Sequence, residues 1–338
     1  MESNQQSNGG FLGSQEKEDT KSITKSLLCI ILDLNFDVWM KKAEEISAHN
    51  SKNGSTSEVP ADVNKSELYF DCIKKMCFFI NAHLLQSSNN EVAVYGSFPH
   101  EALFLGPKND EAIGLKFTTF SSNLMKSIED LYSDEKFQEA MASESKGYSK
   151  IGSALKKSSC FINSWNLKNY RPDVTLNSRI MIFQASPDNN DDYYSVVNSI
   201  FACQKNSVVI DSIMFNKQDS ILLQQCSYLT NGIYTKTLDR EEIVNFLFMD
   251  NYCLDSQTRK SFNRTFQEEL DLRVSCSCCN KIINYGYVCS NCLTLYCEDT
   301  EKLQESDCRT CKSKLSIDIN KPELDLGCIE APETQPRR

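Results

Sequence analysis

The chain has 338 residues, 40% of them hydrophobic and 24% charged, which is enough for two domains of about 150 residues, one of them with a sizeable core. Its 46 acidic and 36 basic residues give a net charge of -10 at pH 7, which argues against binding to nucleic-acid phosphates or anionic lipids by charge. The sequence shows neither a secretory signal nor an apolar run of about 18 residues, and this predicts an intracellular protein that does not cross a membrane.

Short apolar runs alternate with amphipathic segments after a polar start. Residues 1–25 predict a disordered tail, and the apolar run 26–34 (SLLCIILDL) is typical of a buried strand. A polar stretch over 47–66, which contains Gly54 and Pro60, predicts a loop. Further along we expect a helix over 67–85, strands over 91–98 and 102–105, and partly helical structure over 117–141.

The second half of the chain continues this alternation. We expect helices over 151–165, 193–203, 220–229 and 239–249, and strands over 179–183, 207–215 and 233–235. Apolar strands that alternate with helices predict an α/β domain with a doubly wound, mostly parallel sheet. The expected domain boundaries are 26–250 for this α/β domain, 251–270 for a polar connector, 271–315 for a Cys-rich module and 316–338 for a disordered tail.

The first strand ends in Asp33, Asn35 and Asp37, at the edge of the sheet where α/β domains bind ligands. This end resembles that of von Willebrand factor A domains, in which Asp-x-Ser-x-Ser and a later Thr hold magnesium. The run 147–155 is similar to the segment that carries this Thr, with Ser149 in its place. Ala185 takes the place of a further Asp. The resemblance implies a von Willebrand factor A-like fold with a degenerate magnesium site that is empty.

Eight of the 16 cysteines lie between Cys276 and Cys311, the density expected of metal ligands in a reducing compartment. Cys289, Cys292, Cys308 and Cys311 form two C-x₂-C pairs separated by fifteen residues. This spacing predicts a closed, tetrahedral Zn²⁺ site with a structural role.

The other four cysteines of the module, Cys276, Cys278, Cys279 and Cys297, allow two interpretations. They form a second zinc site in a cross-brace arrangement with the first, or some of them are free thiols or packing residues. Adjacent cysteines such as Cys278 and Cys279 rarely both bind one ion.

Nothing in the sequence predicts catalysis or direct DNA binding. It contains no G-x-S-x-G or H-E-x-x-H motif and only three histidines, and His83 falls on an amphipathic segment where packing is its expected role. Six basic and six acidic residues balance over 271–315, so we expect the module to contact protein through an apolar face. The candidate residues are Tyr285, Tyr287, Val288, Leu293, Leu295 and Tyr296, and we expect about half of them to form the small core of the module itself.

The order of the two predicted parts resembles one family, the smaller von Willebrand-A subunit of the general transcription and DNA-repair factor TFIIH. The similarity covers about residues 26–315 and departs from the family in the loop 47–66, at Cys279, where the family often has His, and in the acidic C-terminal tail. The residues that carry it lie in 26–35 with Trp39, 80–84, 178–180, 199–205, 222–226, 230–234 and 286–293.

This resemblance implies a non-catalytic structural subunit of the TFIIH core, located in the nucleus. It implies that the chain pairs with the second von Willebrand-A, zinc-bearing subunit, helps to hold two DNA helicases, and meets DNA only through the complex. RNA polymerase II transcription initiation and nucleotide excision repair follow from that assembly. The main alternative is a RING-like adaptor of a ubiquitin ligase, since cross-brace zinc modules also recruit conjugating enzymes.

Overall fold

The computed structural model describes residues 23–52, 65–107, 117–143, 147–189, 192–238, 242–249, 252–255, 258–262, 274–276, 278–279, 282–283, 286–292, 294–297, 307–308 and 311–314. Of the tails expected over 1–25 and 316–338, residues 1–22 and 316–338 lie outside the described residues. So do Tyr285 and Leu293 of the expected apolar face. The prediction of a tail is wrong for residues 23–25, which begin strand β1 (Ile23–Asp33) because they pair with residues 174–176 of the neighbouring strand.

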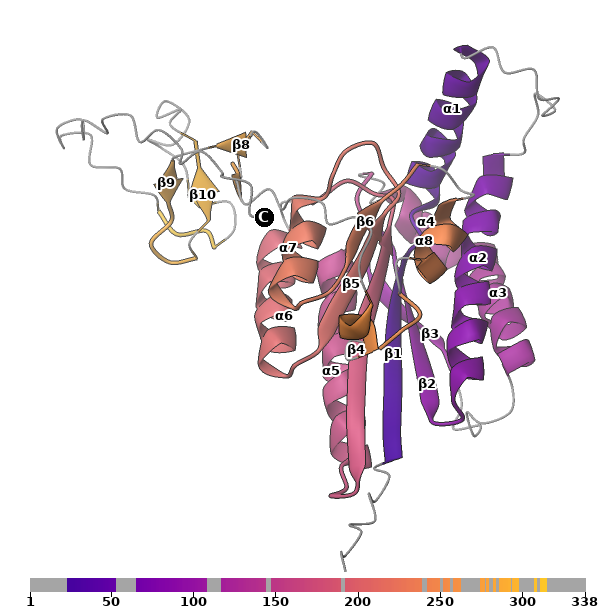
Figure 1. Cartoon of the computed structure of the whole chain (residues 1–338). Coiled ribbons are helices and arrows are strands. Elements are labelled where there is room, and N and C mark those ends of the chain that lie inside the picture. The colour runs from indigo at the N-terminus through magenta and orange to yellow at the C-terminus, as the bar shows by residue number, and fades with distance from the viewer. Residues whose placement is uncertain are drawn as a thin grey trace, which may run out of the picture.

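A six-stranded sheet in the order β3-β2-β1-β4-β5-β6 forms the centre of the α/β domain (Figure 1). All neighbouring strands are parallel except β2 and β3, which are antiparallel. The predicted doubly wound, mostly parallel sheet is therefore confirmed. Its strands are β1 (Ile23–Asp33), β2 (Asn90–Ser97), β3 (Ala102–Gly106), β4 (Val174–Gln184), β5 (Val209–Met214) and β6 (Tyr234–Lys236).

Helices cover both faces of the sheet (Figure 1). On one face α1, α2, α3, α4 and α8 contribute to a core around Trp39 and Phe215, and on the other α5, α6 and α7 pack around Leu155 and Ile200. No helix in the described part of the chain is long and apolar enough to span a membrane. The helices are α1 (Phe36–Lys52), α2 (Lys65–Gln86), α3 (Phe117–Ser133), α4 (Glu135–Ser143), α5 (Ile151–Asn169), α6 (Tyr193–Lys205), α7 (Ile221–Leu229) and α8 (Glu242–Met249).

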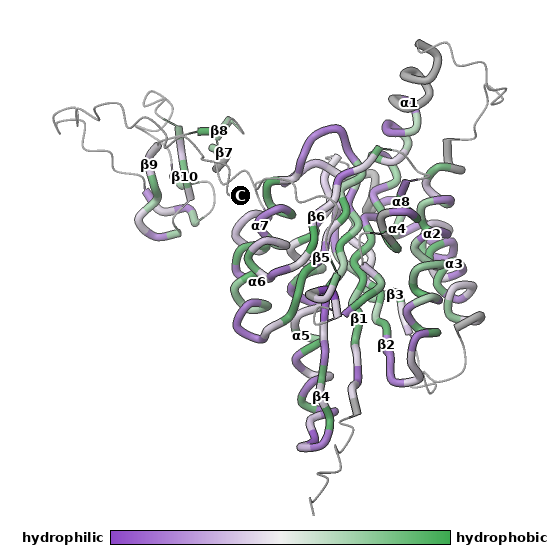
Figure 2. The backbone as a smooth tube through the Cα atoms, in the orientation of Figure 1, coloured by the Kyte–Doolittle hydropathy of each residue, from purple (hydrophilic) through white to green (hydrophobic). Residues whose placement is uncertain are grey.

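The unbroken apolar run of β1 follows from this two-sided burial. Leu28, Ile30 and Leu32 point into the first core, while Leu27, Cys29 and Ile31 point into the second, because successive side chains of a strand alternate between faces. Figure 2 shows the hydrophobic residues concentrated along the central strands. The sheet thus brings the carboxyl ends of β1 and β4 side by side, with Leu32 opposite Phe183.

The loop predicted from residue 47 is wrong for residues 47–52, because α1 continues to Lys52. Val38, Trp39 and Ala43 recur on one side of this helix and are buried against the sheet. The first residue that breaks a helix, Gly54, lies beyond its end. The helix therefore extends through polar residues that on composition alone predict a loop.

The segment predicted as a polar connector, 251–270, is held to the sheet by two of its described residues, Tyr252 and Arg259. Tyr252 is fully buried in the core, and Arg259, in the short 3₁₀ helix η2 (Thr258–Ser261), forms an ion pair with buried Asp211. One polar residue of this segment, Arg259, is thus the partner of a buried carboxylate.

Candidate metal centres

The Cys-rich module contains two short antiparallel β-ribbons. One joins β7 (Val274–Ser275) to β8 (Ile282–Ile283), and the other joins β9 (Tyr287–Val288) to β10 (Leu295–Tyr296). Cys276, Cys289 and Cys297 each follow directly after one of these strands. Cysteines therefore lie at the ends of these strands and in the segments that connect the paired strands.

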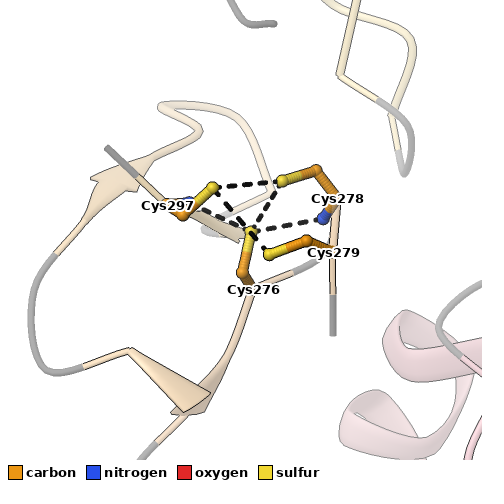
Figure 3. Close-up of side chains that lie close together, drawn as sticks. All are labelled: Cys276, Cys278, Cys279 and Cys297. Carbon is orange, nitrogen blue, oxygen red and sulfur yellow. Dashed lines mark hydrogen bonds between the residues drawn. The ribbon is translucent and has the colours of Figure 1, made fainter. Parts of the chain in front are cut away.

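The first Cys cluster comprises Cys276, Cys278, Cys279 and Cys297, whose sulfur atoms converge (Figure 3). The Sγ atoms of Cys276 and Cys278 lie 2.9 Å apart, and Cys297 Sγ lies 3.3 Å from Cys278 and 3.9 Å from Cys279. The backbone N–H groups of Cys278 and Cys297 donate to Cys276 Sγ at 3.3 and 3.0 Å. All four sulfur atoms lie within 4.8 Å of one another.

The second Cys cluster comprises Cys289, Cys292, Cys308 and Cys311. Its Sγ atoms lie 3.6 Å apart between Cys289 and Cys311 and 3.4 Å apart between Cys292 and Cys308. All four again lie within 4.8 Å of one another. Cys289 and Cys308 are buried, so this cluster forms the interior of the module.

Hydrogen bonds hold the two C-x₂-C turns of the second Cys cluster. The N–H of Cys289 donates to Thr294 O at 2.9 Å, and the N–H of Cys308 donates to Ser313 O at 2.7 Å. Lys312, at the end of the second turn, has a φ of 61°, which is uncommon for a residue other than glycine. The turns are thus closed by the backbone and do not depend on the sulfur atoms alone.

Side chains outside the cysteine motifs also reach the second Cys cluster. The hydroxyl of buried Tyr296 donates to Cys308 Sγ at 3.1 Å, and Ser313 Oγ lies 2.9 Å from Cys311 Sγ. Gly286 permits the close approach of the two strands, because a Cβ atom there would lie 2.2 Å from Tyr296 O. Sequence reasoning missed Ser313 as a contact, although its place two residues after Cys311 is a usable signal.

The two clusters are interleaved along the chain. Cys276–Cys279 belong to the first, Cys289 and Cys292 to the second, Cys297 to the first, and Cys308 and Cys311 to the second. The segments of the two clusters therefore alternate along the chain, which is the connectivity of a cross-brace arrangement. Disruption of one cluster removes a constraint from the segments that hold the other.

The cysteine thiols within each cluster differ in pKa. Burial opposes ionisation of Cys276, but the Cys278 thiol and neighbouring N–H groups donate to it and lower its pKa to about 6. Hydrogen bonds from Ser313 and from the backbone lower the pKa of Cys289 to about 6. Burial, together with neighbouring thiols, raises the pKa of Cys278 well above its usual value, and burial raises that of Cys292 to about 11. Four thiolates so close together repel one another, so their joint ionisation requires a cation.

The chemistry and spacing of both sulfur sets suit a tetrahedral metal ion. A Zn–S distance of about 2.3 Å places tetrahedral sulfur ligands roughly 3.8 Å apart, close to the 3.3–3.9 Å of most measured pairs. Each cluster could therefore hold a metal ion. Four cysteine ligands leave no position for water or substrate, as in sites with a structural role.

The residues at the degenerate magnesium site are joined to one another by hydrogen bonds. Asp33 Oδ2 accepts from the backbone N–H groups of Ala185 and Ser186 at 3.0 and 2.7 Å. Its Oδ1 accepts from the Asn35 N–H at 3.1 Å and from the Ser149 hydroxyl. Protein donors thus occupy both carboxylate oxygens, so this arrangement does not fit magnesium.

Asp37 does not join this group, although the sequence analysis places it there. It lies exposed in the first turn of α1, because the helix begins directly after Asn35. Asn35 remains buried beside Asp33 and donates through Nδ2 to Tyr148 O at 3.2 Å. Of the four predicted residues, the structure brings Asp33, Asn35 and Ser149 together and leaves Asp37 outside.

We expect the α/β domain to fold and bind without magnesium. Titration of Mg²⁺ into the full-length protein should give no heat above dilution, and EDTA or excess Mg²⁺ should leave the unfolding midpoint followed by tryptophan fluorescence unchanged. Both tryptophans, Trp39 and Trp165, are buried in this domain. Binding of Mg²⁺ at micromolar concentration would contradict this expectation.

His83 is buried on α2, away from both Cys clusters. Neither of its ring nitrogens has a hydrogen-bond partner among the described residues. Burial and, to a lesser extent, the nearby Arg179 lower its pKa to about 3. The imidazole is therefore neutral at physiological pH and packs within the domain, as the sequence predicts.

Comparison with known proteins identifies the family. The chain matches the family described as transcription factor Tfb4 over residues 25–312. It is 31% identical over 262 residues to "General transcription factor IIH subunit 3" of Dictyostelium discoideum, covering 72% of this chain and 67% of that protein. It is also 28% identical over 302 residues to "General transcription and DNA repair factor IIH subunit tfb4" of Schizosaccharomyces pombe, covering 87% and 90%.

A solved structure agrees on the fold of the α/β domain. The crystal structure of the TFIIH p34 N-terminal domain covers 68% of this chain, and 98% of that chain is matched, with a TM-score of 0.52 and 23% sequence identity. The long match to the family, together with the expected von Willebrand factor A-like fold and Cys-rich module, supports one conclusion. The chain belongs to the transcription factor Tfb4 family.

Proposed function

We propose that this protein is a non-catalytic structural subunit of the TFIIH core that acts in RNA polymerase II transcription initiation and nucleotide excision repair. The observation that carries the proposal is the match to the Tfb4 family over residues 25–312, which spans both the α/β domain and the Cys-rich module. Relatives over this length are named as subunits of transcription and DNA repair factor IIH. The expected location is the nucleus.

A structural role agrees with the chemistry of the described residues. We propose Zn²⁺ as the ion of both Cys clusters, because it favours four thiolate ligands in tetrahedral geometry. Such a site stabilises a fold and has no open position for a reaction. The buried acid Asp33 is fully hydrogen-bonded, and the buried His83 is neutral, so neither is placed for acid–base catalysis.

The proposed partners are other TFIIH core subunits, chiefly the second von Willebrand-A, zinc-bearing subunit, with the two helicases held through the assembly. On β9, Tyr287 and Val288 are exposed, 39% and 52%, which suits contact with an apolar protein surface. Tyr296, which pairs with Tyr287 on the neighbouring strand β10, is instead buried at 2% exposure. The described residues of the set are thus divided between an exposed surface and the interior of the module, and we propose the exposed ones for docking.

We expect the protein to bind its partner with little dependence on salt and to bind duplex DNA poorly by itself. A net charge of -10 repels phosphates, whereas an apolar protein interface does not require counterion release. Affinity for the partner subunit and for duplex DNA should be measured side by side from about 50 to 200 mM salt. A DNA binder with 6–10 phosphate contacts loses roughly 10³–10⁵ in affinity over this range. Tight DNA binding with that dependence would contradict the structural role.

A RING-like ubiquitin ligase adaptor is the second candidate, because the two Cys clusters are interleaved as in cross-brace modules. An autoubiquitination assay with the metal-loaded full-length protein distinguishes the two. Transfer of ubiquitin that is lost on Cys289→Ser would favour the adaptor. Co-purification with TFIIH subunits from native extract, without ubiquitin transfer, would favour the structural subunit.

A further inference from the structure

The segment after α8 runs back across the sheet before the chain enters the Cys-rich module. We call residues 252–262 the strap; residues 252–255 and 258–262 of it are described. Its two halves are held in different ways, and this difference has a consequence for how the strap opens.

The first half of the strap is fixed in the core. Tyr252 is fully buried, and its hydroxyl lies 3.0 Å from Ser212 O and 2.8 Å from Thr235 Oγ1. Arg179 Nη1 donates to the carbonyl groups of Tyr252 and Leu254 at 2.5 and 2.9 Å. These contacts join the strap to β4, β5 and β6, so opening this half requires opening the core.

Among the described side chains of the second half, that of Arg259 reaches the sheet, and its Nη2 also donates to Tyr252 O at 3.2 Å. Thr258, Ser261 and Phe262 are exposed, whereas the Arg259 side chain is only 10% exposed. Arg259 Nη1 and Nη2 donate to the two carboxylate oxygens of Asp211 at 2.8 and 2.7 Å. A bidentate pair of this kind gives geometric specificity as well as energy.

The acceptor is built into the sheet and stays in place without the strap. Asp211 is a residue of β5 with no exposed surface, and its Oδ1 also accepts from the Ile233 N–H at 3.0 Å. Arg179 Nη1 lies 3.6 Å from Asp211 Oδ2. Gly232 keeps this site open, because a Cβ atom there would lie 1.9 Å from Ile210 O and 3.2 Å from Asp211 Oδ1. The carboxylate thus retains one guanidinium and one N–H donor when Arg259 leaves.

We infer that Arg259 is a latch: its release from Asp211 frees residues 258–262 while the sheet and the Tyr252 anchor remain closed. Few buried apolar contacts and an exposed backbone are the marks of a segment that opens at lower free energy than the whole domain. The latch lies between the α/β domain and β7 of the module. In the closed state Arg259 holds the described residues 258–262 against the sheet, and in the open state the described residues that stay fixed are 252–255. The latch therefore sets where the described part of the strap last contacts the sheet.

Hydrogen exchange on the full-length protein tests this latch. The amides of Arg259 and Phe262 donate to Asp255 O and Arg259 O, each at 3.1 Å, and report on the second half directly. In Arg259→Met we expect these amides to exchange at least about tenfold faster, and by a larger factor than the amides of β4 and β5. Arg259→Lys keeps the charge but not the bidentate geometry, and it should fall between wild type and Arg259→Met.

Lys236→Met is the matched control. Lys236 pairs with Asp219 at 2.6 Å on the surface of the same domain, where these side chains are 29% and 40% exposed, and its loss should leave exchange in the strap unchanged. Unchanged exchange at Arg259 and Phe262 in both Arg259 variants would overturn the inference. Equal acceleration in the strap, β4 and β5 would also overturn it, because the strap would then open only with the sheet.

Discussion

Replacement of Cys289 by serine is expected to remove the metal of the second Cys cluster and unfold the Cys-rich module, while the α/β domain stays folded. Cys289 is one of the four cysteines that we propose as ligands of a closed site. The free energy of metal binding in such sites, on the order of 10 kcal/mol or more, is also folding free energy. Cys311→Ser should have the same effect from the other end of the cluster.

Metal content and tryptophan fluorescence measure the two parts of this prediction. Inductively coupled plasma mass spectrometry on the purified variant should show the loss of at least one Zn²⁺ per chain, and more if the interleaved first Cys cluster is also released. Both tryptophans lie in the α/β domain, so their emission should not change. Cys160→Ser, at an exposed cysteine on α5 outside both clusters, is the control. A full zinc complement in Cys289→Ser would show that the ligands are wrongly assigned.

The sheet was predictable because burial on two faces leaves a strong pattern in the sequence. β1 contains an unbroken apolar run from Leu27 to Leu32, and four of the six residues of β5 are apolar, as is typical of strands covered on both sides. The first half of β4 was missed, since Thr175, Asn177 and neighbouring polar residues carry no such pattern. It is a strand because β1 continues beside it, with Ile23 paired to Val174.

The Cys clusters were predictable from spacing, whereas their surroundings were not. A C-x₂-C pair places two sulfurs on one turn whatever the rest of the fold, so local sequence carries the information. The contacts of Tyr296 with Cys308 and of Ser313 with Cys311 depend on how distant turns meet. For Asp37 the local spacing was misleading. Its position four residues after Asp33 suggests that the two carboxylates lie together, but α1 begins between them and Asp37 lies on the surface.

The strap shows why composition misled at the end of the α/β domain. Its arginine and polar residues predict a solvated connector, but the partner of Arg259 lies 48 residues earlier in β5. A buried Asp in an apolar strand is the signal that could have been used. Charged side chains are almost never fully buried without a partner, so Asp211 itself predicts that a distant cation covers it.

Asp211→Asn is expected to destabilise the α/β domain strongly. The substitution keeps the shape but removes the charge that compensates Arg259 and the fully buried Arg179. Breaking a buried pair by removal of one partner costs about 3–5 kcal/mol. Asp219→Asn removes a carboxylate from the exposed pair with Lys236, and such surface pairs contribute about 0–1 kcal/mol. Urea unfolding of the full-length variants, followed by tryptophan fluorescence, compares the two.

The pH dependence of the stability difference between wild type and Asp211→Asn separates an electrostatic cause from a packing defect. Burial raises the pKa of Asp211, but Arg259 and Arg179 outweigh it and hold the pKa below its ordinary value. The contribution of the carboxylate is therefore complete above about pH 4 and is lost as the pH falls below that value. The free energies of unfolding of wild type and Asp211→Asn should thus converge on acidification, because protonation removes from the wild type the charge that the variant already lacks. A difference that stays constant from neutral pH to about pH 3 would mean that the amide disturbs packing and that the ion pair adds little to stability.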